Sequence, residues 1–171
     1  ITGGAYHTCA LLNDNTVKCW GYNNKGQLGQ GDALRRGDGP TEMGDNLPAV
    51  NLGTGKTALA ITGGTFHTCA SLNDNSVKCW GNNSYGQLGQ GFDSAKGDRT
   101  EDMGDNLPAV NLGSAFTVQK IAIAGGSIYG NQTCALSIGN TVKCWGDNTF
   151  GSLGLGDTIR RGDGPGEMGE N

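Results

Sequence analysis

The six cysteines of this 171-residue chain are the residues best suited to do chemistry, and they come in three pairs. Ten positions separate the two cysteines of each pair. Such strict pairing favours structural disulfides made in an oxidising compartment. Zinc binding is a weaker interpretation, because the close Cys-x-x-Cys spacing and clustered histidines of zinc sites are lacking. Free buried thiols remain the alternative for an intracellular protein. The predicted bonds are Cys9–Cys19, Cys69–Cys79 and Cys134–Cys144.

Three carboxylates in a polar loop form the one candidate cation site. Asp38, Glu42 and Asp45 could converge on calcium, which takes several oxygen ligands. Their spacing matches no EF-hand or nonapeptide pattern, so we favour acids that cap turns and accept backbone N–H groups. No cofactor is therefore expected, with calcium as the alternative.

The same loop contains Arg-Gly-Asp, a known integrin-binding tripeptide, at Arg36–Asp38 and again at Arg161–Asp163. The equivalent stretch between them is Lys96-Gly97-Asp98. A basic residue, a turn glycine and an acid in all three places favour a role in fixing the loop over cell adhesion.

Catalytic signatures are missing from the sequence. There is no Gly-x-Ser-x-Gly, P-loop or His-Glu-x-x-His motif. His7 and His67 occupy equivalent positions, but Gln132 fills the third, so a shared proton-transfer role is not expected. The chain is predicted not to be an enzyme.

Charge and hydropathy narrow the range of partners. The net charge of −4 and a pI near 5.0 argue against a nucleic-acid partner, which usually calls for a basic patch. No apolar run approaches the ~20 residues of a membrane span. Two Asn-x-Ser/Thr triplets, at Asn82 and Asn131, predict glycosylation and agree with secretion.

The elements that must position these residues are repeated along the chain. Cys69 follows Cys9 by 60 residues, and Cys134 follows Cys69 by 65. A fixed period of this length is the signature of a repeat architecture. The predicted units are residues 1–46, 47–106 and 107–171. The third is the loosest, with extra residues around Gly125–Gly126.

Each unit is predicted to be a β-propeller blade of about four strands. In the second copy the strands are 58–62, 67–72, 77–80 and an outer strand at 107–112, and the first copy is expected to lack its leading strand. Placing Cys69 opposite Cys79 puts Ser71 opposite Val77 and leaves the three-residue turn 73–75. The other copies then pair Leu11 with Val17 and Leu136 with Val142.

A tryptophan follows the second cysteine of every copy, and a leucine follows eight residues later. A row of stacked ligand-binding rings is one interpretation, but a core between blades is preferred. The residues concerned are Trp20, Trp80, Trp145, Leu28, Leu88 and Leu153.

Copies one and two contain Gly-Gly-x-x-His-Thr-Cys-Ala, and all three contain Val-Lys-Cys-Trp-Gly-x-Asn followed by Gly-Gln/Ser-Leu-Gly. The chain thereby closely resembles the regulator of chromosome condensation repeat, which forms seven-bladed propellers. The resemblance is greatest to secreted, disulfide-containing members. Three repeats do not close such a ring, so either the chain is a piece of a longer one or copies of it complete one another.

These features predict a non-catalytic extracellular propeller module that binds a protein or a glycan, or copies of itself. One alternative is the subunit of an extracellular filament or surface appendage. Another is an intracellular guanine-nucleotide exchange factor or regulatory propeller, as some members of the family that the chain resembles are.

Overall fold

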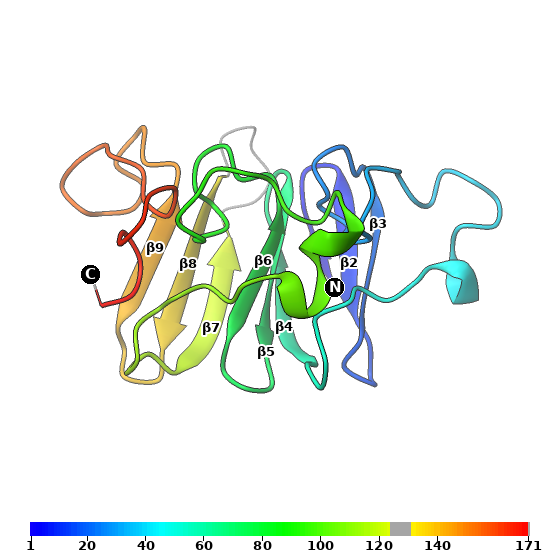
Figure 1. Ribbon diagram of the computed structural model, residues 1–171, viewed down its shortest axis with the longest axis horizontal. Helices are drawn as coiled ribbons and strands as arrows, with labels where there is room; N and C mark the ends of the chain where they lie inside the picture. Colours follow the sequence, from blue (N-terminus) through cyan, green and yellow to red (C-terminus); the bar gives the residue numbers. More distant parts are fainter. Residues whose placement is uncertain (124–130, 171) are drawn as a thin grey trace.

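The computed structural model describes residues 1–123 and 131–170, and over these the chain is all-β. Three antiparallel sheets of three strands follow one another along the chain, and Figure 1 shows them side by side along the long axis. The sheets are β1 (Thr2–Gly3), β2 (His7–Leu11) and β3 (Val17–Gly21); β4 (Ala58–Gly63), β5 (His67–Leu72) and β6 (Val77–Gly81); and β7 (Val118–Ile123), β8 (Gln132–Ser137) and β9 (Val142–Gly146).

The loops between the sheets carry short turns of 3-10 helix. These are η1 (Gly44–Asn46), η2 (Thr100–Asp102) and η3 (Gly104–Asn106). In the described part of the chain no helix is long and apolar enough to cross a membrane. The extra residues around Gly125–Gly126 lie outside the described residues.

The register predicted for the central hairpin is confirmed. Cys69 pairs with Cys79 and Ser71 with Val77, and the first and third sheets repeat the pattern. Each hairpin turns through an asparagine with positive φ, a conformation that asparagine tolerates better than most residues. These residues are Asn15, Asn75 and Asn140.

The predicted fourth strand does not form as a regular strand, and among the described residues each blade has three strands. The segment 107–112 runs extended beside β6, but its one backbone bond to that strand is from the Val110 N–H to the Val77 carbonyl. Pro108 has no N–H to donate, and its carbonyl accepts from the side chain of Gln90. The equivalent bond in the first blade joins Val50 to Val17.

The first blade does have a leading strand, contrary to the sequence prediction. It is the two-residue β1, which pairs Thr2 with Cys9 and Gly3 with Thr8. It occupies the place that the six-residue β4 holds in the second blade.

The hydrophobic core lies in the two seams between adjacent blades. One cluster joins Val17, Cys19 and Leu28 of the first blade to Leu72 and Trp80 of the second. The other repeats this arrangement between the second and third blades, around Trp145. A blade therefore buries its apolar face against its neighbour, as expected of units too small to fold alone.

Candidate binding surface and the seams that position it

The disulfides lie within the blades that the sequence pairing predicted. The bonds join Cys9 to Cys19, Cys69 to Cys79 and Cys134 to Cys144, and each brings the two Cα atoms to 4.1 Å. No cysteine is free. Each bond clamps the middle strand of a blade to its outer strand, so the faces that form the seams are held in register.

A hydrogen-bonded clamp crosses the first seam. Nε2 of His7 lies 2.8 Å from Oγ1 of Thr68 in the next blade. The Thr68 hydroxyl donates to the carbonyl of Gln27, back in the first blade. The same carbonyl accepts the indole N–H of Trp80. Because the threonine hydroxyl donates to Gln27, it accepts from histidine, so the His7 proton lies on Nε2.

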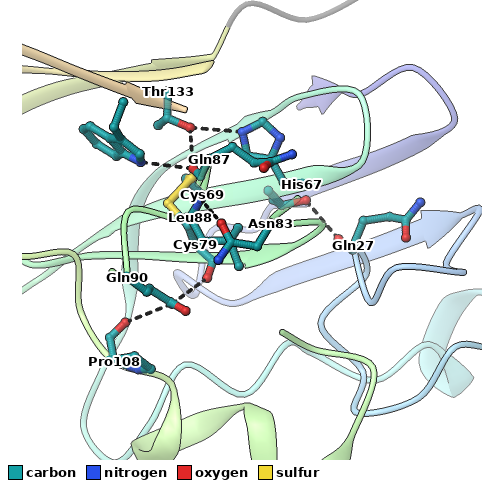
Figure 2. Close-up of a disulfide and its surroundings, with 12 residues drawn as sticks. Gln27, His67, Cys69, Cys79, Asn83, Gln87, Leu88, Gln90, Pro108 and Thr133 are labelled. Atoms are coloured by element: carbon teal, nitrogen blue, oxygen red, sulfur yellow. Dashed lines mark hydrogen bonds between the residues drawn. A yellow bond between two sulfur atoms is a disulfide. The ribbon is translucent and has the colours of Figure 1, made fainter. Parts of the chain in front are cut away.

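The second seam repeats this clamp with equivalent residues. Nε2 of His67 lies 3.0 Å from Oγ1 of Thr133, which donates to the Gln87 carbonyl. The indole N–H of Trp145 reaches the same carbonyl at 3.0 Å. Figure 2 shows His67, Thr133 and Gln87 converging beside the Cys69–Cys79 bond. The recurring His-Thr-Cys, Trp-Gly and Gly-Gln-Leu-Gly motifs are thus parts of one joint between blades.

The paired glycines of these motifs make room for the imidazoles. A Cβ atom on Gly64 would lie 2.3 Å from the ring of His67, and one on Gly4 2.2 Å from the ring of His7. Burial lowers the pKa of His7 to about 4. Burial, with a smaller contribution from the charge of His7, lowers that of His67 to about 3. Both rings are neutral near pH 7, which fits a joint and not a proton-transfer site.

The loop after each tryptophan is held by a buried asparagine. The Asn23 amide donates to the carbonyls of Asp32 and Leu34, while its oxygen accepts from the N–H of Leu28. Asn83 and Asn148 hold the corresponding loops. These contacts explain the Trp-Gly-x-Asn motif and place Leu28 in the seam.

Four of the six predicted inter-blade core residues lie in the seams: Trp80, Trp145, Leu28 and Leu88 are fully buried there. Leu153 is buried but belongs to neither seam cluster. Trp20 is partly exposed, because the face it belongs to has no described blade beside it.

The Arg-Gly-Asp loop turns its arginine inward. Arg36 forms an ion pair with Asp32 and donates to the carbonyl of Leu34. Its backbone pairs with Gly21 at the end of β3. Arg161 is held in the same way by Asp157 and Gly146. A guanidinium committed to its own loop does not offer the exposed tripeptide of an adhesion site.

The three carboxylates considered for calcium do not form a cluster. Glu42 accepts the backbone N–H groups of residues 37, 38 and 39, and these bonds hold its pKa below the ordinary value. Asp38 instead pairs with Arg35. Asp45 lies in η1, and its counterpart Asp105 accepts from Thr54. Among the described residues, no group of three or more His, Cys, Asp or Glu side chains could hold a metal ion.

The two predicted glycosylation sites are buried. Asn82 is 9% exposed, and its oxygen accepts from Ser84. Asn131 is 5% exposed and accepts from Gln87. The folded chain does not present either asparagine as an exposed acceptor.

An aromatic cluster opens at one end of the first seam, and the sequence analysis missed it. Tyr6 precedes β2, Tyr22 follows β3 and Phe66 precedes β5, so all three lie at one edge of the sheets. The rings of Tyr6 and Phe66 stack at 5.4 Å, and Tyr22 meets Tyr6 edge-on at 6.2 Å. Together they line a shallow hollow of about 440 Å³. Tyr6 is 55% exposed.

The same edge of the third blade is polar. Asn131 replaces Tyr6 and Phe66, and Asp147 replaces Tyr22. At the first seam, the guanidinium of Arg35 lies 5.8 Å from the Tyr22 ring centre. The cluster is therefore an apolar patch bordered by one cation, confined to the first seam. The available signal was the aromatic residue before each His-Thr-Cys in copies one and two.

Comparison with known proteins agrees with this geometry. Residues 1–27 and 59–87 match the Regulator of chromosome condensation (RCC1) repeat. The Ultraviolet-B receptor UVR8 of Arabidopsis thaliana is 36% identical over 160 residues, which are 92% of this chain and 31% of the receptor. The E3 ubiquitin-protein ligase HERC2 of Homo sapiens is 30% identical over 153 residues, 88% of this chain and 3% of the ligase.

Solved structures show the same fold at low identity. Prp20p of Saccharomyces cerevisiae superposes with a TM-score of 0.62 at 18% identity, over 95% of this chain and 36% of its own. Human WBSCR16 superposes with a TM-score of 0.61 at 20% identity, over 85% of this chain and 32% of its own. The chain spans about a third or less of these relatives. It consists of RCC1-like β-propeller blades.

Proposed function

We propose that this chain is a non-catalytic interaction module that works in an oxidising compartment outside the cell. Its partner is a protein, and its docking surface is the cluster of Tyr6, Tyr22 and Phe66. The observation that carries the proposal is that these three rings meet at one edge of a disulfide-clamped scaffold, where Tyr6 is exposed and Tyr22 and Phe66 are partly exposed. Aromatic residues are enriched at the centres of protein interfaces and carry much of their binding energy.

The contacts made by the histidines and arginines support a binding function over a catalytic one. The buried histidines and the Arg-Gly-Asp arginines are engaged in structural contacts. Yeast Prp20, whose fold this chain shares, is described bound to Kap60 and binding Gsp1p and histones. Protein partners on a propeller of this type support a protein over a glycan for this chain.

Three closed disulfides support the extracellular location, because cytosolic reductants keep most thiols reduced. The rival is an intracellular regulatory or nucleotide-exchange propeller. The chain should be isolated from its own cells under acid quench, unfolded in denaturant, and then treated at neutral pH with a thiol-alkylating reagent without reduction. No modified cysteine is expected, whereas six modified cysteines would favour the rival.

The docking surface is tested by photo-crosslinking. A benzophenone amino acid at position 6 should give a discrete protein adduct in medium from the producing cells, and Phe66→Ser should abolish it. The matched control carries the same amino acid at Ile138, which is 66% exposed but lies at another turn. Equal adducts at both positions, or none at position 6, would contradict the docking surface.

A further inference from the structure

The loop that follows each blade contains three consecutive backbone N–H groups, and in two blades these groups share one acceptor. The N–H groups of residues 37–39 all donate to Oε2 of Glu42, at 2.8, 3.1 and 2.9 Å. Those of residues 162–164 all donate to Oε2 of Glu167, at 2.8, 3.1 and 2.8 Å. Successive N–H groups arranged in this way form a nest, which binds anions. The first and third blades therefore each place a carboxylate of their own in the nest.

The second blade has the same nest backbone at residues 97–99. Gly97 has a φ of 98°, against 97° and 96° for the glycines that begin the other two nests. In all three blades the N–H at the glutamate position bonds to the carbonyl three residues earlier, which here joins Asp102 to Arg99. The three N–H groups are therefore held as they are in the other blades.

The second and third nests also lie in matching places between blades. A Cβ atom on Gly26 of the first blade would lie 2.4 Å from the backbone nitrogen of Asp98. One on Gly86 of the second blade would lie 2.6 Å from the backbone nitrogen of Asp163. Since the third nest holds a carboxylate in this setting, packing against the neighbouring blade leaves room for one.

The acceptor is what differs in the second blade. Asp102, one methylene shorter than glutamate, pairs through Oδ1 with Nζ of Lys96 at 2.9 Å. Lys96 takes this partner because Phe92 replaces the aspartate that holds the equivalent arginine in the other blades. In the described part of the chain, no group accepts from the N–H groups of residues 97–99.

The second nest opens to solvent at one end, where it gains a positive charge. Gly97 is buried and Asp98 partly buried, but Arg99 is exposed. Arg99 stands where the other two nests have glycine. Within residues 1–123 and 131–170 its guanidinium forms no ion pair. Buried backbone N–H groups are nearly always paired, and a charged partner makes the stronger hydrogen bond.

We propose that the nest of residues 97–99 binds a carboxylate from another molecule, either an acidic side chain or the C-terminus of a polypeptide. The three N–H groups hold its oxygen as they hold Oε2 of Glu42 and Glu167 in the other blades. Arg99 lies beside it and supplies the opposite charge. This site is distinct from the aromatic cluster, so either can fail without the other.

The test is a titration of the oxidised chain with acetate, followed by backbone amide NMR at pH 7 and constant ionic strength. The amide signals of residues 97–99 should shift and saturate. Those of residues 37–39 and 162–164 should not, because their nests already hold a carboxylate. Asp102→Glu should abolish the response at 97–99 by supplying the missing internal acceptor. Arg99→Gly should weaken acetate binding about two- to fivefold, the contribution of an exposed ion pair.

Glu167→Ala is the reciprocal control, because it removes the internal carboxylate from a nest in a matching place. The amides of residues 162–164 should then respond to acetate. Absence of a saturable shift at 97–99 in wild type would overturn the proposal. So would equal shifts in all three wild-type nests, or an unchanged response in folded Asp102→Glu.

Two peptides identify the source of the carboxylate. One carries a single glutamate and an amidated C-terminus, and the other has no acidic side chain but a free C-terminus. The peptide that saturates the shifts at residues 97–99 at the lower concentration shows which carboxylate the site prefers. If neither peptide shifts these amides, the nest does not take the carboxylate of a polypeptide and the proposal fails.

Discussion

Nε2 of His7 in β2 lies 2.8 Å from the hydroxyl oxygen of Thr68 in β5, 61 residues further along the chain. This bond joins two blades, and the same hydroxyl donates a hydrogen bond to the Gln27 carbonyl. A single threonine thus serves as acceptor and donor at the centre of a buried joint. The packing of one blade against the next is stabilised by such polar contacts as well as by the tryptophans beside them.

Thr68→Val should destabilise the chain strongly for so small a change. The substitution leaves the His7 N–H without its acceptor and removes one donor from the Gln27 carbonyl. Loss of a buried partner costs about 1–3 kcal/mol of unfolding free energy, which urea titration would measure. Thr8→Val is the matched control at the equivalent, partly exposed position of the first blade. It should change stability by less than about 0.5 kcal/mol, and equal losses would contradict the role of the clamp.

Stability should fall as the pH drops from about 6.5 towards 4. The unfolded histidines bind protons below about pH 6.5, but burial holds the pKa of folded His7 at about 4 and that of His67 at about 3. In this window the unfolded state binds more protons, so protonation favours unfolding. Each histidine can contribute a slope of up to about 1.4 kcal/mol per pH unit. Denaturant titrations at several pH values would measure the slope.

The matched variant is the double substitution His7→Gln and His67→Gln, which places glutamine where β8 already has Gln132. It should flatten the curve between pH 4.5 and 6.5. Carboxylates with lowered pKa values, such as Glu42, lose their contribution only as the pH approaches their unfolded pKa of about 4.5, so they add little slope above about pH 5.5. An unchanged slope in the double variant would show that other groups carry the pH dependence.

The Cys134–Cys144 disulfide should be the first to be reduced. Both of its cysteines are partly exposed, whereas those of the other two bonds are fully buried. A phosphine in limiting amount, followed by alkylation and peptide mass analysis, should label the third pair before the first two. Simultaneous labelling of all three pairs in dilute solution would contradict the prediction.

The sequence could predict what is local to one repeat. Cysteines ten residues apart and a three-residue turn define the hairpin register, and the structure has that register. The outer segment was predicted as a strand because its apolar residues and starting proline suit an edge. The structure gives it one backbone bond to β6, from Val110. Local pattern does not reveal how many ladder bonds an edge segment makes.

Contacts between repeats were harder to predict. The recurrence of His-Thr-Cys shows that the motif matters, but not that histidine of one copy meets threonine of the next. The aromatic cluster was missed for the same reason. Tyr6 and Phe66 lie 60 residues apart, and only the stacking of two blades brings their rings to 5.4 Å.

Gly64→Ala should destabilise the second seam, because the glycine leaves room for the His67 ring. The added Cβ atom would lie 2.3 Å from the His67 ring, which is fully buried and bonded to Thr133. Overpacking of this kind costs about 1–3 kcal/mol of unfolding free energy. Gly139→Ala is the control, because its nearest neighbour lies 3.6 Å from the new Cβ. Combining Gly64→Ala with His67→Ala should cost less than the sum of the two single changes, since the smaller side chain relieves the collision. Strict additivity would show that the glycine is required for some reason other than room for the imidazole.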